Sequence, residues 1–329
     1  MITLDKVKLV TSLDYVKIIN KEIYDTKYKS GVLTSISFNI TEPYSVYMEL
    51  DYEEDELVIE FSGKILKDRY NELINVNNVE VCLKNLEIEC GCRLDIPSIL
   101  QNNTVVKIDV SKDIECPDCK ELTTYLSSHV KNYKKYLPRI IGGNFVVEKN
   151  VKTKGYKKRL TIYDKYKEML KASNKSFLFS TNNPNEILES FKEKVRLELN
   201  LNSIEQIRKS LKITSTSLID ILNAPVNPIC DFINEVFEDD STNDYRPTTM
   251  SDLCRLALLK ECNMDIEKVE MIAREVSSKG THISQVMKPF KAILARLSNC
   301  NGEKIIDILQ TLLLFEIFII YYLVYDDLF

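Results

Sequence analysis

Apolar and polar residues alternate with a period of two along much of the first half of the chain. The alternation is clearest at 34–40, 45–50 and 56–61. It is the pattern of β-strands that bury one face and expose the other. Because an acidic loop separates the second and third of these segments, we predict that they form a β-hairpin.

The strand pattern continues beyond this hairpin. Further strands are predicted at 79–83 and 104–110, with a short helix near 96–100 between them. The runs at 144–148 and 158–163 are suited to pair antiparallel across a basic turn. The β-rich region is therefore expected to cover most of the first two hundred residues.

The residue spacing changes at Tyr163. The alternating run up to this tyrosine gives way to apolar positions three and four apart, which predicts a strand that ends near Tyr163 and a short helix that begins at or just after it. The run 191–201 alternates again, with Arg196, Glu198 and Asn200 on one face and apolar residues on the other. We therefore expect this strand to have one polar face and one face in the core.

Beyond residue 203 the pattern becomes helical. Ser203 and Gln206 resemble a capping box that opens a helix ending near residue 211, and Gly280 is suited to stop a helix. The short link at 263–264 suits a helix-turn-helix as well as the core of a helical bundle, and we favour the bundle. Further helices are predicted at 228–238, 251–262, 265–279 and 283–299.

These patterns predict an α+β fold. A β-rich catalytic domain, 1–202, is expected to hold an antiparallel sheet with flanking helices, and an all-helical C-terminal domain, 203–329, is expected to follow it. With 44% hydrophobic and 28% charged residues, the composition is that of an ordinary soluble protein. No internal repeat and no long low-complexity segment is visible.

Glycine and cysteine usage narrow the class of protein. None of the eight glycines stands in a GxGxxG or GxxxxGK pattern, which argues against Rossmann and P-loop nucleotide sites. The first residues carry charges where a signal peptide needs an apolar run, and nine cysteines is an odd number for a fully paired framework. We therefore expect a protein of the reducing cytoplasm.

The apolar segment 311–325 raises the question of a membrane. It is about fifteen residues long and contains Glu316, whereas a bilayer-spanning helix needs about 20 apolar residues. We expect a buried helix or an oligomer contact, such as that of a homodimer, and no membrane partner.

The charge distribution is strongly asymmetric. The net charge is −5, but residues 129–175 contain fourteen Lys or Arg against three acids, which leaves −16 on the rest of the chain. Such a segregated positive field can steer nucleic acid to one face, although a solvated basic surface is the simpler explanation. The residues we predict to contact DNA are Lys154, Lys157, Lys158, Arg159 and Arg196.

Four residues on the predicted strands suggest phosphodiester chemistry. If the strands that carry Asp109, Tyr163 and Glu198 are neighbours, their side chains can converge on one face. Two carboxylates can hold Mg²⁺ or Mn²⁺ through oxygen ligands, and that ion polarises a phosphate next to the tyrosine. Lys165, two residues after the tyrosine, can neutralise negative charge that develops on the phosphate.

A structural explanation of the same residues stays open. Asp109 and Glu198 also fit surface positions on half-exposed strands, paired with Lys107 and Arg196, and tyrosine in a strand usually serves packing. Tyr166 follows three residues after the first tyrosine, so on a helix both could face one side and act in turn.

Three segments carry a resemblance to a known family. They are the strand 105–113, the run 159–165 with Glu168 shortly after it, and the run 195–199. In order and rough spacing they resemble the rolling-circle replication initiators of small plasmids and single-stranded DNA phages, the group of replication initiation factors and filamentous-phage replication proteins. The resemblance covers about residues 55–212.

The resemblance implies a site-specific DNA endonuclease and strand transferase. Such an enzyme nicks a single-stranded or hairpin replication origin, stays linked to it through a 5′-phosphotyrosine, recruits a host helicase, and rejoins the strand. By the match, Tyr163 is the nucleophile, Asp109 and Glu198 are metal ligands, and Lys165 is an electrostatic partner.

One departure from the family concerns the metal. Many rolling-circle enzymes hold it with a His-hydrophobic-His motif, whereas this chain has only His129 and His282, far apart. A site of carboxylate ligands is therefore implied, with Asp113 and Glu148 as further candidates.

Two other functions remain open. The same basic face, with a C-terminal helix-turn-helix, suits a non-catalytic DNA-binding regulator of replication or transcription. The thiols of Cys90, Cys92, Cys116 and Cys119 could instead form a structural zinc site in an interaction protein.

Overall fold

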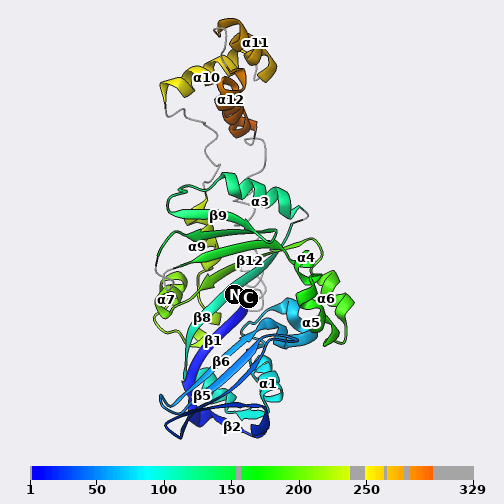
Figure 1. Ribbon diagram of the computed structural model, residues 1–329, viewed down its shortest axis with the longest axis vertical. Coiled ribbons are helices and arrows are strands. Elements are labelled where there is room, and N and C mark those ends of the chain that lie inside the picture. Colours follow the sequence, from blue (N-terminus) through cyan, green and yellow to red (C-terminus); the bar gives the residue numbers. More distant parts are fainter. Residues whose placement is uncertain are drawn as a thin grey trace, which may run out of the picture. The chain divides into compact units, whose positions relative to one another are not determined.

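The protein folds into two compact units in a computed structural model that describes residues 2–116, 118–152, 157–237, 249–262, 265–277 and 282–298 (Figure 1). The first unit contains the described residues up to 237, and the second contains those from 249 to 298. The first unit is built on a large antiparallel sheet with helices, and the second is helical. The predicted α+β class is confirmed.

Ten antiparallel strands form the main sheet, in the order β3-β4-β5-β6-β1-β8-β12-β11-β10-β9. A separate two-stranded sheet pairs β2 (Val16–Ile18) with β7 (Cys92–Leu94). The strands of the main sheet are β1 (Leu4–Ser12), β3 (Asp25–Lys29), β4 (Val32–Ile40), β5 (Val46–Asp51), β6 (Glu56–Ser62), β8 (Asn103–Glu115), β9 (Tyr136–Ile141), β10 (Asn144–Lys149), β11 (Arg159–Asp164) and β12 (Lys194–Leu201).

Helices and 3₁₀ segments connect and cover the strands. The 3₁₀ segments are η1 (Leu13–Tyr15), η2 (Lys21–Ile23), η3 (Gly63–Glu72) and η5 (Ala172–Asn174). The helices of the first unit are α1 (Val79–Cys90), α2 (Ile96–Gln101), α3 (Cys119–Ser128), α4 (Lys165–Met169), α5 (Lys175–Phe179), α6 (Pro184–Ser190), α7 (Ile204–Leu211), α8 (Leu218–Leu222) and α9 (Pro228–Val236).

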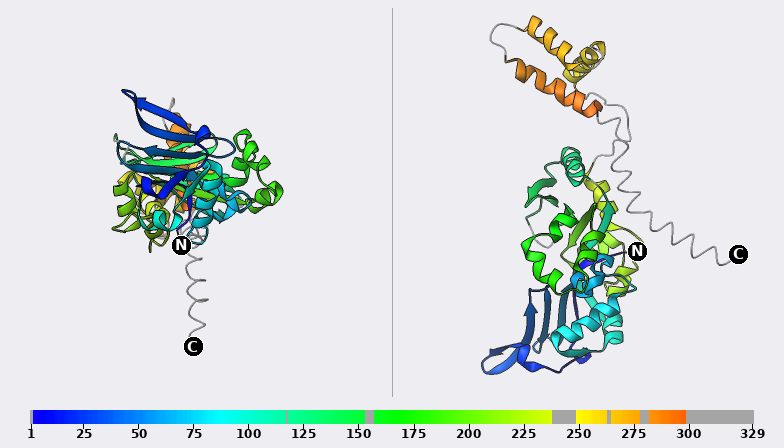
Figure 2. Two further views of the ribbon diagram at one scale, coloured as in Figure 1. Left: turned by 90° about the horizontal axis from the view of Figure 1, so that it is seen from below. Right: turned by 90° about the vertical axis from the view of Figure 1, so that its right-hand side faces the viewer.

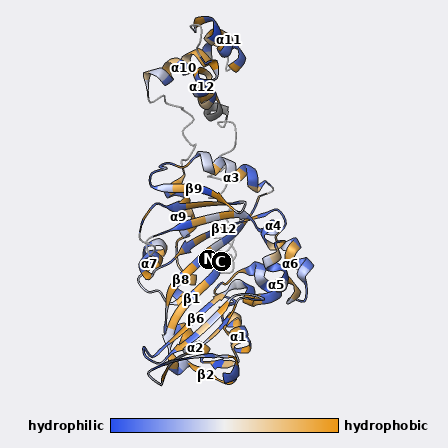
Figure 3. Cartoon of the chain, in the orientation of Figure 1, coloured by the Kyte–Doolittle hydropathy of each residue, from blue (hydrophilic) through white to orange (hydrophobic). Residues whose placement is uncertain are grey.

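The alternation of residue types gives the sheet one apolar face and one largely polar face, so both colours occur along the strands in Figure 3. On β12, Val195, Leu197 and Leu199 are buried, and helices α7, α8 and α9 contact β8 and β12. In the right-hand view of Figure 2, helices α1 and α2 (cyan) lie on one side of strands β3 to β6 (blue). The burial of this apolar face supplies the main driving force for folding.

The predicted strand pairs are formed. The hairpin of β5 and β6 pairs Tyr47 with Glu60, and β10 pairs with β11 so that Glu148 lies opposite Arg159. Helix α4 begins at Lys165, two residues after the tyrosine, as the change of spacing predicts. Ser203 caps α7 by accepting a hydrogen bond from the backbone N–H of Gln206.

The segment predicted as a strand at 79–83 is helical instead. It opens α1, in which Val79, Cys82, Leu83 and Leu86 are buried. These positions recur every three to four residues, the spacing of one helix face. The prediction was wrong because the two valines and the short length of the segment mimic a strand.

The boundary predicted at residue 202 differs from the observed one. Helices α7, α8 and α9 pack on the sheet, so the first compact unit extends through residue 237. Their buried faces include Ile207, Leu222 and Phe232. These helices therefore complete the core of the β-rich unit and do not belong to a separate C-terminal domain.

The second unit consists of α10 (Met250–Glu261), α11 (Ile266–Val276) and α12 (Ile283–Ser298). Leu259, Val269 and Met287 are buried in its own core. In the part of the chain that the structure describes, no helix combines the length and apolar character needed to cross a membrane. The predicted link at 263–264, the stop at Gly280 and the apolar segment 311–325 lie outside the described residues.

Candidate functional site

The strands that carry Asp109, Glu198 and Tyr163 are neighbours in the order β8-β12-β11. On β12, Asn200 lies opposite Asp109 of β8 and opposite Arg159 of β11. Glu198 precedes Asn200 by two residues on β12, and Tyr163 follows Arg159 by four residues on β11. Side chains an even number of residues apart point to the same face of a strand. The arrangement that the sequence left open is thus present, with all three groups on one face.

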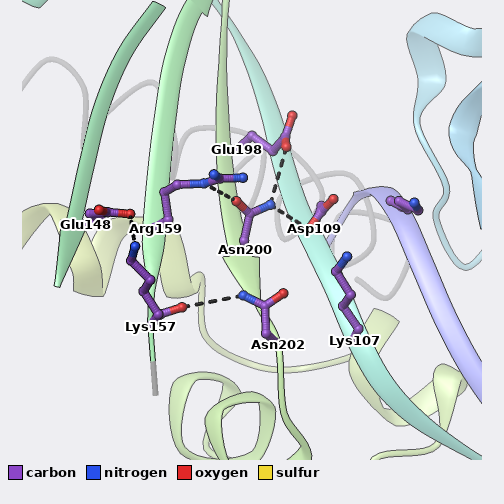
Figure 4. A pocket seen from close by; sticks show the side chains of 9 residues that line it. Lys107, Asp109, Glu148, Lys157, Arg159, Glu198, Asn200 and Asn202 are labelled. Carbon is purple, nitrogen blue, oxygen red and sulfur yellow. Dashed lines mark hydrogen bonds and ion pairs between the residues drawn. The ribbon is translucent and has the colours of Figure 1, made fainter. Parts of the chain in front are cut away.

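A cavity of about 540 Å³ opens on this polar face. Figure 4 shows its side chains, which come from β1, β8, β10, β11 and β12 and their ends. Carboxylates, amides and cations alternate around it. The lining residues are Lys6, Lys107, Asp109, Glu148, Lys157, Arg159, Glu198, Asn200 and Asn202.

Asn200 connects the groups of the cavity. Its amide Nδ2 donates to Asp109 Oδ1 at 2.6 Å and to Glu198 Oε1 at 3.4 Å, and its Oδ1 accepts from Arg159 Nε at 2.8 Å (Figure 4). Asn200 therefore fixes the two carboxylates and the guanidinium relative to one another. The sequence signal for it was its place on the polar face of β12, but nothing there indicated its partners.

Tyr163 contacts Glu198 but is not among the residues that line the cavity. Its hydroxyl donates to Glu198 Oε2 at 3.2 Å, and the residue is 7% exposed. Burial raises the pKa of Tyr163 well above its usual value, and the nearby carboxylate of Glu198 raises it further. The phenol is thus protonated in this state and donates its hydrogen bond to a carboxylate of the cavity wall.

The two carboxylates disfavour each other's charge. The pKa of Glu198 is raised to about 7 by burial and then by the negative charges of Asp5 and Asp109. Burial likewise raises the pKa of Asp109, against the hydrogen bond from Asn200. A cation between these groups would relieve the repulsion.

Their chemistry fits a divalent ion. Oxygens of Asp109 and Glu198 both accept from the same amide nitrogen of Asn200, so they lie close together, with that nitrogen between them. Mg²⁺ commonly uses one or two carboxylates and completes its shell with water and substrate phosphates. Among the residues that the structure describes, no group of three or more His, Cys, Asp or Glu is placed to hold a metal, so such an ion would depend on these two acids and on non-carboxylate oxygens.

Lys165 lies next to the tyrosine but away from the cavity. It is buried, and its Nζ donates to the hydroxyl of Tyr70 at 2.7 Å while lying 5.6 Å from the ring centroid of Tyr163. Burial and then the positive charge of Arg196 lower its pKa to about 7. Lys165 therefore contacts the ring of Tyr163 and does not reach the cavity, so a direct role on a phosphate, as predicted, does not fit this position.

Arg196 requires a correction. It is fully buried and donates two hydrogen bonds to Asp113, at 2.6 and 2.7 Å, and one each to Asp5 and Tyr70. A guanidinium with no exposed surface cannot contact DNA. The predicted DNA contact is therefore wrong, and Arg196 instead holds the N-terminal strand to β8 and β12.

The remaining predicted DNA contacts divide between two faces. Lys157 and Arg159 line the cavity, whereas Lys158 packs on α9, with its Nζ 5.4 Å from the ring centroid of Phe232. Neighbouring residues of an extended chain point to opposite faces, so Lys158 is separated from the cavity, and its contact with DNA stays a prediction. Lys154 lies outside the described residues.

Two cations were missed by the sequence reasoning. Lys6 of β1 and Lys107 of β8 line the cavity next to Asp109. Lys6 lies directly opposite Asp109, and the order of the strands brings it there. The first strand of the chain was not predicted, so no sequence signal placed Lys6 at the site.

The further metal candidates have other partners. Glu148 lines the cavity but forms ion pairs with Lys157 at 3.0 Å and with Arg139 at 3.7 Å. Asp113 forms an ion pair with the guanidinium of Arg196. Tyr166 stands in the first turn of α4, whereas Tyr163 is on β11, so the helical spacing that would align the two tyrosines does not apply.

The four cysteines considered for zinc do not come together. Cys90 and Cys92 are buried at the junction of α1 and β7, and Cys116 and Cys119 flank the start of α3. Within the described part of the chain these thiols are free and form no metal-binding group. They therefore do not form the four-thiolate site that the sequence left open.

Glu198→Gln is expected to stabilise the protein at about pH 8 in the presence of EDTA. The pKa of Glu198 is raised from 4.5 to about 7, so the folded state loses stability as the pH rises from about 4.5 and the loss is complete above about 7. The substitution should raise the free energy of unfolding by roughly 1–3 kcal/mol at about pH 8 and much less at about pH 5. Chemical denaturation at the two pH values measures the difference.

Glu60→Gln provides the opposite control. Burial opposes the charge of Glu60, but Lys6, whose Nζ lies 2.6 Å away, outweighs it and lowers the pKa of this carboxyl. Glu60→Gln should therefore reduce stability at about pH 8, by up to about 1 kcal/mol. Added Mg²⁺ should raise the free energy of unfolding of the parent protein more than it raises that of the Glu198→Gln variant. A loss of stability in both variants would contradict the unfavourable charge at Glu198.

No protein-family model matches the chain, and no curated protein matches it either.

Proposed function

We propose that this chain nicks and rejoins DNA by strand transfer through Tyr163, in the manner of a rolling-circle replication initiator. The observation that supports this most is the hydroxyl of Tyr163 bonded to Glu198 at the wall of a cavity that also holds Asp109, Arg159 and Lys107. A nucleophile, a proton acceptor, and groups for phosphate binding thus occur together.

Glu198 is the proton acceptor in this proposal. As the hydroxyl proton of Tyr163 passes to Glu198 Oε2, the phenolic oxygen bonds to phosphorus and the bond from phosphorus to the 3′ oxygen breaks. Protonated Glu198 returns the proton to the leaving 3′ oxygen. The product is a 5′-phosphotyrosine and a free 3′-hydroxyl, and the reverse sequence rejoins a strand without another source of energy.

The cavity cations bind the phosphate on which this step acts. Lys6, Lys107 and Arg159 come from three strands of a rigid sheet, so they can be preorganised around the negative charge that develops during transfer. Asn200 positions Arg159 and the two carboxylates, which makes it a positioning residue.

Asp109 and Glu198 would hold Mg²⁺ or Mn²⁺ at the site. When bound, such an ion supplies charge stabilisation to the phosphoryl oxygens.

Partners and compartment follow from the same proposal. DNA with an exposed single-stranded or hairpin segment is the substrate, and a host helicase and a second copy of the chain are further partners of such an initiator. The eight described cysteines are all free thiols, which suits the reducing cytoplasm.

A non-catalytic DNA-binding regulator is the second candidate. The observation in its favour is that the phenol of Tyr163 is largely buried and protonated, as a structural tyrosine would be. In that case the cavity cations would bind phosphates and no bond would be broken.

An experiment that detects a covalent adduct between protein and DNA distinguishes the strand transferase from the non-catalytic regulator. The purified chain is incubated with labelled pools of random single-stranded and hairpin oligonucleotides in Mn²⁺ or Mg²⁺, and adducts that survive denaturing electrophoresis are counted. The proposed function predicts an adduct that EDTA abolishes. DNA binding without any adduct across the pools would instead support the regulator.

A further inference from the structure

The ten-stranded sheet repeats one topology twice. In the first half, β1 is followed by the meander β3 to β6, and β6 pairs back onto β1; in the second half, β8 is followed by the meander β9 to β12, and β12 pairs back onto β8. The two halves join where β1 and β8 pair antiparallel in the middle of the sheet (Figure 1). Strands β5, β6 and β1 are thus equivalent to β11, β12 and β8, although the sequence shows no repeat.

Each half contains a row of paired residues that begins with a tyrosine. In the second half, Tyr163, Arg196 and Asp113 lie opposite one another across β11, β12 and β8. In the first half, the row across β5, β6 and β1 is Tyr47, Glu60 and Lys8. Both rows begin with a tyrosine, but the signs of the two following charges are reversed.

Glu60 of the first half is a poor metal ligand. Lys6 and Lys8 approach the carboxylate of Glu60 at 2.6 and 3.8 Å, so its charge is already balanced. Tyr47 donates instead to Glu49 Oε2 at 2.5 Å. Glu60 therefore differs from Asp109 and Glu198, which accept from the same amide nitrogen of Asn200.

The first half presents lysines instead. Lys8 lies directly opposite Lys107 in the β1-β8 pair, and like charges at such positions destabilise a sheet. Among the residues that the structure describes, no hydrogen bond or ion pair holds the ammonium of Lys107, which lines the cavity together with Lys6. The carboxylates of Glu60 and Asp109 offset part of this positive charge, and an anion bound between these strands would offset more of it.

An aromatic ring stands beside these cations. The Nζ of Lys8 is 5.7 Å from the ring centroid of Tyr47, which is partly exposed. Surfaces that hold a single strand combine cations, which bind its phosphates, with aromatic rings, which stack on its bases.

We propose that Lys107, Lys8 and Tyr47 form a track that binds single-stranded DNA leading away from the cavity. The lysines take two backbone phosphates, and Tyr47 stacks on a base. This inference rests on the proposed function and adds to it: the second half of the sheet carries out the transfer, and the first half, with the same topology but exchanged charges, holds the strand.

The test measures binding in a chain that cannot form an adduct. In a Tyr163→Phe background, Lys8→Gln with Lys107→Gln should weaken binding of a fluorescent single-stranded oligonucleotide on the order of 10-fold and lower the salt slope of log K by about 1.4, roughly 0.7 per phosphate contact. Tyr47→Ala should weaken binding by roughly 5- to 100-fold with the slope unchanged. Tyr47→Phe should bind as the background chain does.

Lys84→Ala, at an exposed position of α1, is the matched control and should change neither affinity nor slope. Unchanged affinity and slope in the Lys8 and Lys107 variant would overturn the track, whether or not the parent chain forms an adduct. If the variant loses binding while the parent forms no adduct, the proposed transfer fails and the binding track stands.

Discussion

Tyr163→Phe is expected to lower the rate of covalent adduct formation by at least about 10³-fold, because it removes the only oxygen of this side chain that can attack phosphorus. The fold should persist. The substitution removes one hydrogen bond to Glu198, so the free energy of unfolding should change by less than about 1.5 kcal/mol. Single-turnover kinetics with a labelled strand measures the rate.

Two other tyrosines control this experiment. Tyr52→Phe, at an exposed turn position between β5 and β6, should leave the rate unchanged. Tyr166→Phe tests the neighbouring tyrosine on α4, which lies on a different element from Tyr163. A chain that lacks the Tyr163 hydroxyl and still forms adduct at the parent rate would remove the nucleophile from the proposal.

The second large effect is on stability. Arg196→Met is expected to reduce the free energy of unfolding by about 3–5 kcal/mol, because it leaves the carboxylates of Asp113 and Asp5 in a buried cluster without their cation. Burial disfavours the charge of Asp5, but the positive charges of Arg196 and Lys165 outweigh it and keep its pKa below the usual value. Urea denaturation followed by circular dichroism measures the loss.

Arg159→Met separates structural from binding roles. Arg159 is exposed and donates to Asn200 at the cavity, so its replacement should cost less than about 1 kcal/mol of stability and weaken DNA binding instead. Equal losses of stability in the two variants would contradict the assignment of Arg196 as a structural residue.

Residue alternation was enough to predict the faces of the strands. On β12, the polar set Arg196, Glu198 and Asn200 follows from period-two spacing alone, and so does the placement of Tyr163 at a strand end. What alternation does not contain is strand order. The position of β1 in the middle of the sheet, which brings Lys6 opposite Asp109, depends on long-range pairing.

Charge was the least reliable guide. Arg196 was predicted to contact DNA, and Lys165 was predicted to neutralise negative charge that develops on the phosphate. Both are buried, since Asp113, Asp5 and Tyr70 supply partners from distant parts of the chain. No local pattern identifies such partners. The helix at 79–83 was missed for a related reason: a short apolar run does not distinguish a strand from one face of a helix.

Peptide mapping of the covalent adduct tests the central claim most directly. The chain is incubated with the oligonucleotide pools and Mn²⁺, the adduct is isolated under denaturing conditions and digested with nuclease and protease, and the modified peptide is sequenced by mass spectrometry. The account predicts a nucleotide 5′-phosphate on Tyr163, in the peptide that follows Arg159. A nucleotide on any other residue, with Tyr163 unmodified, would contradict it.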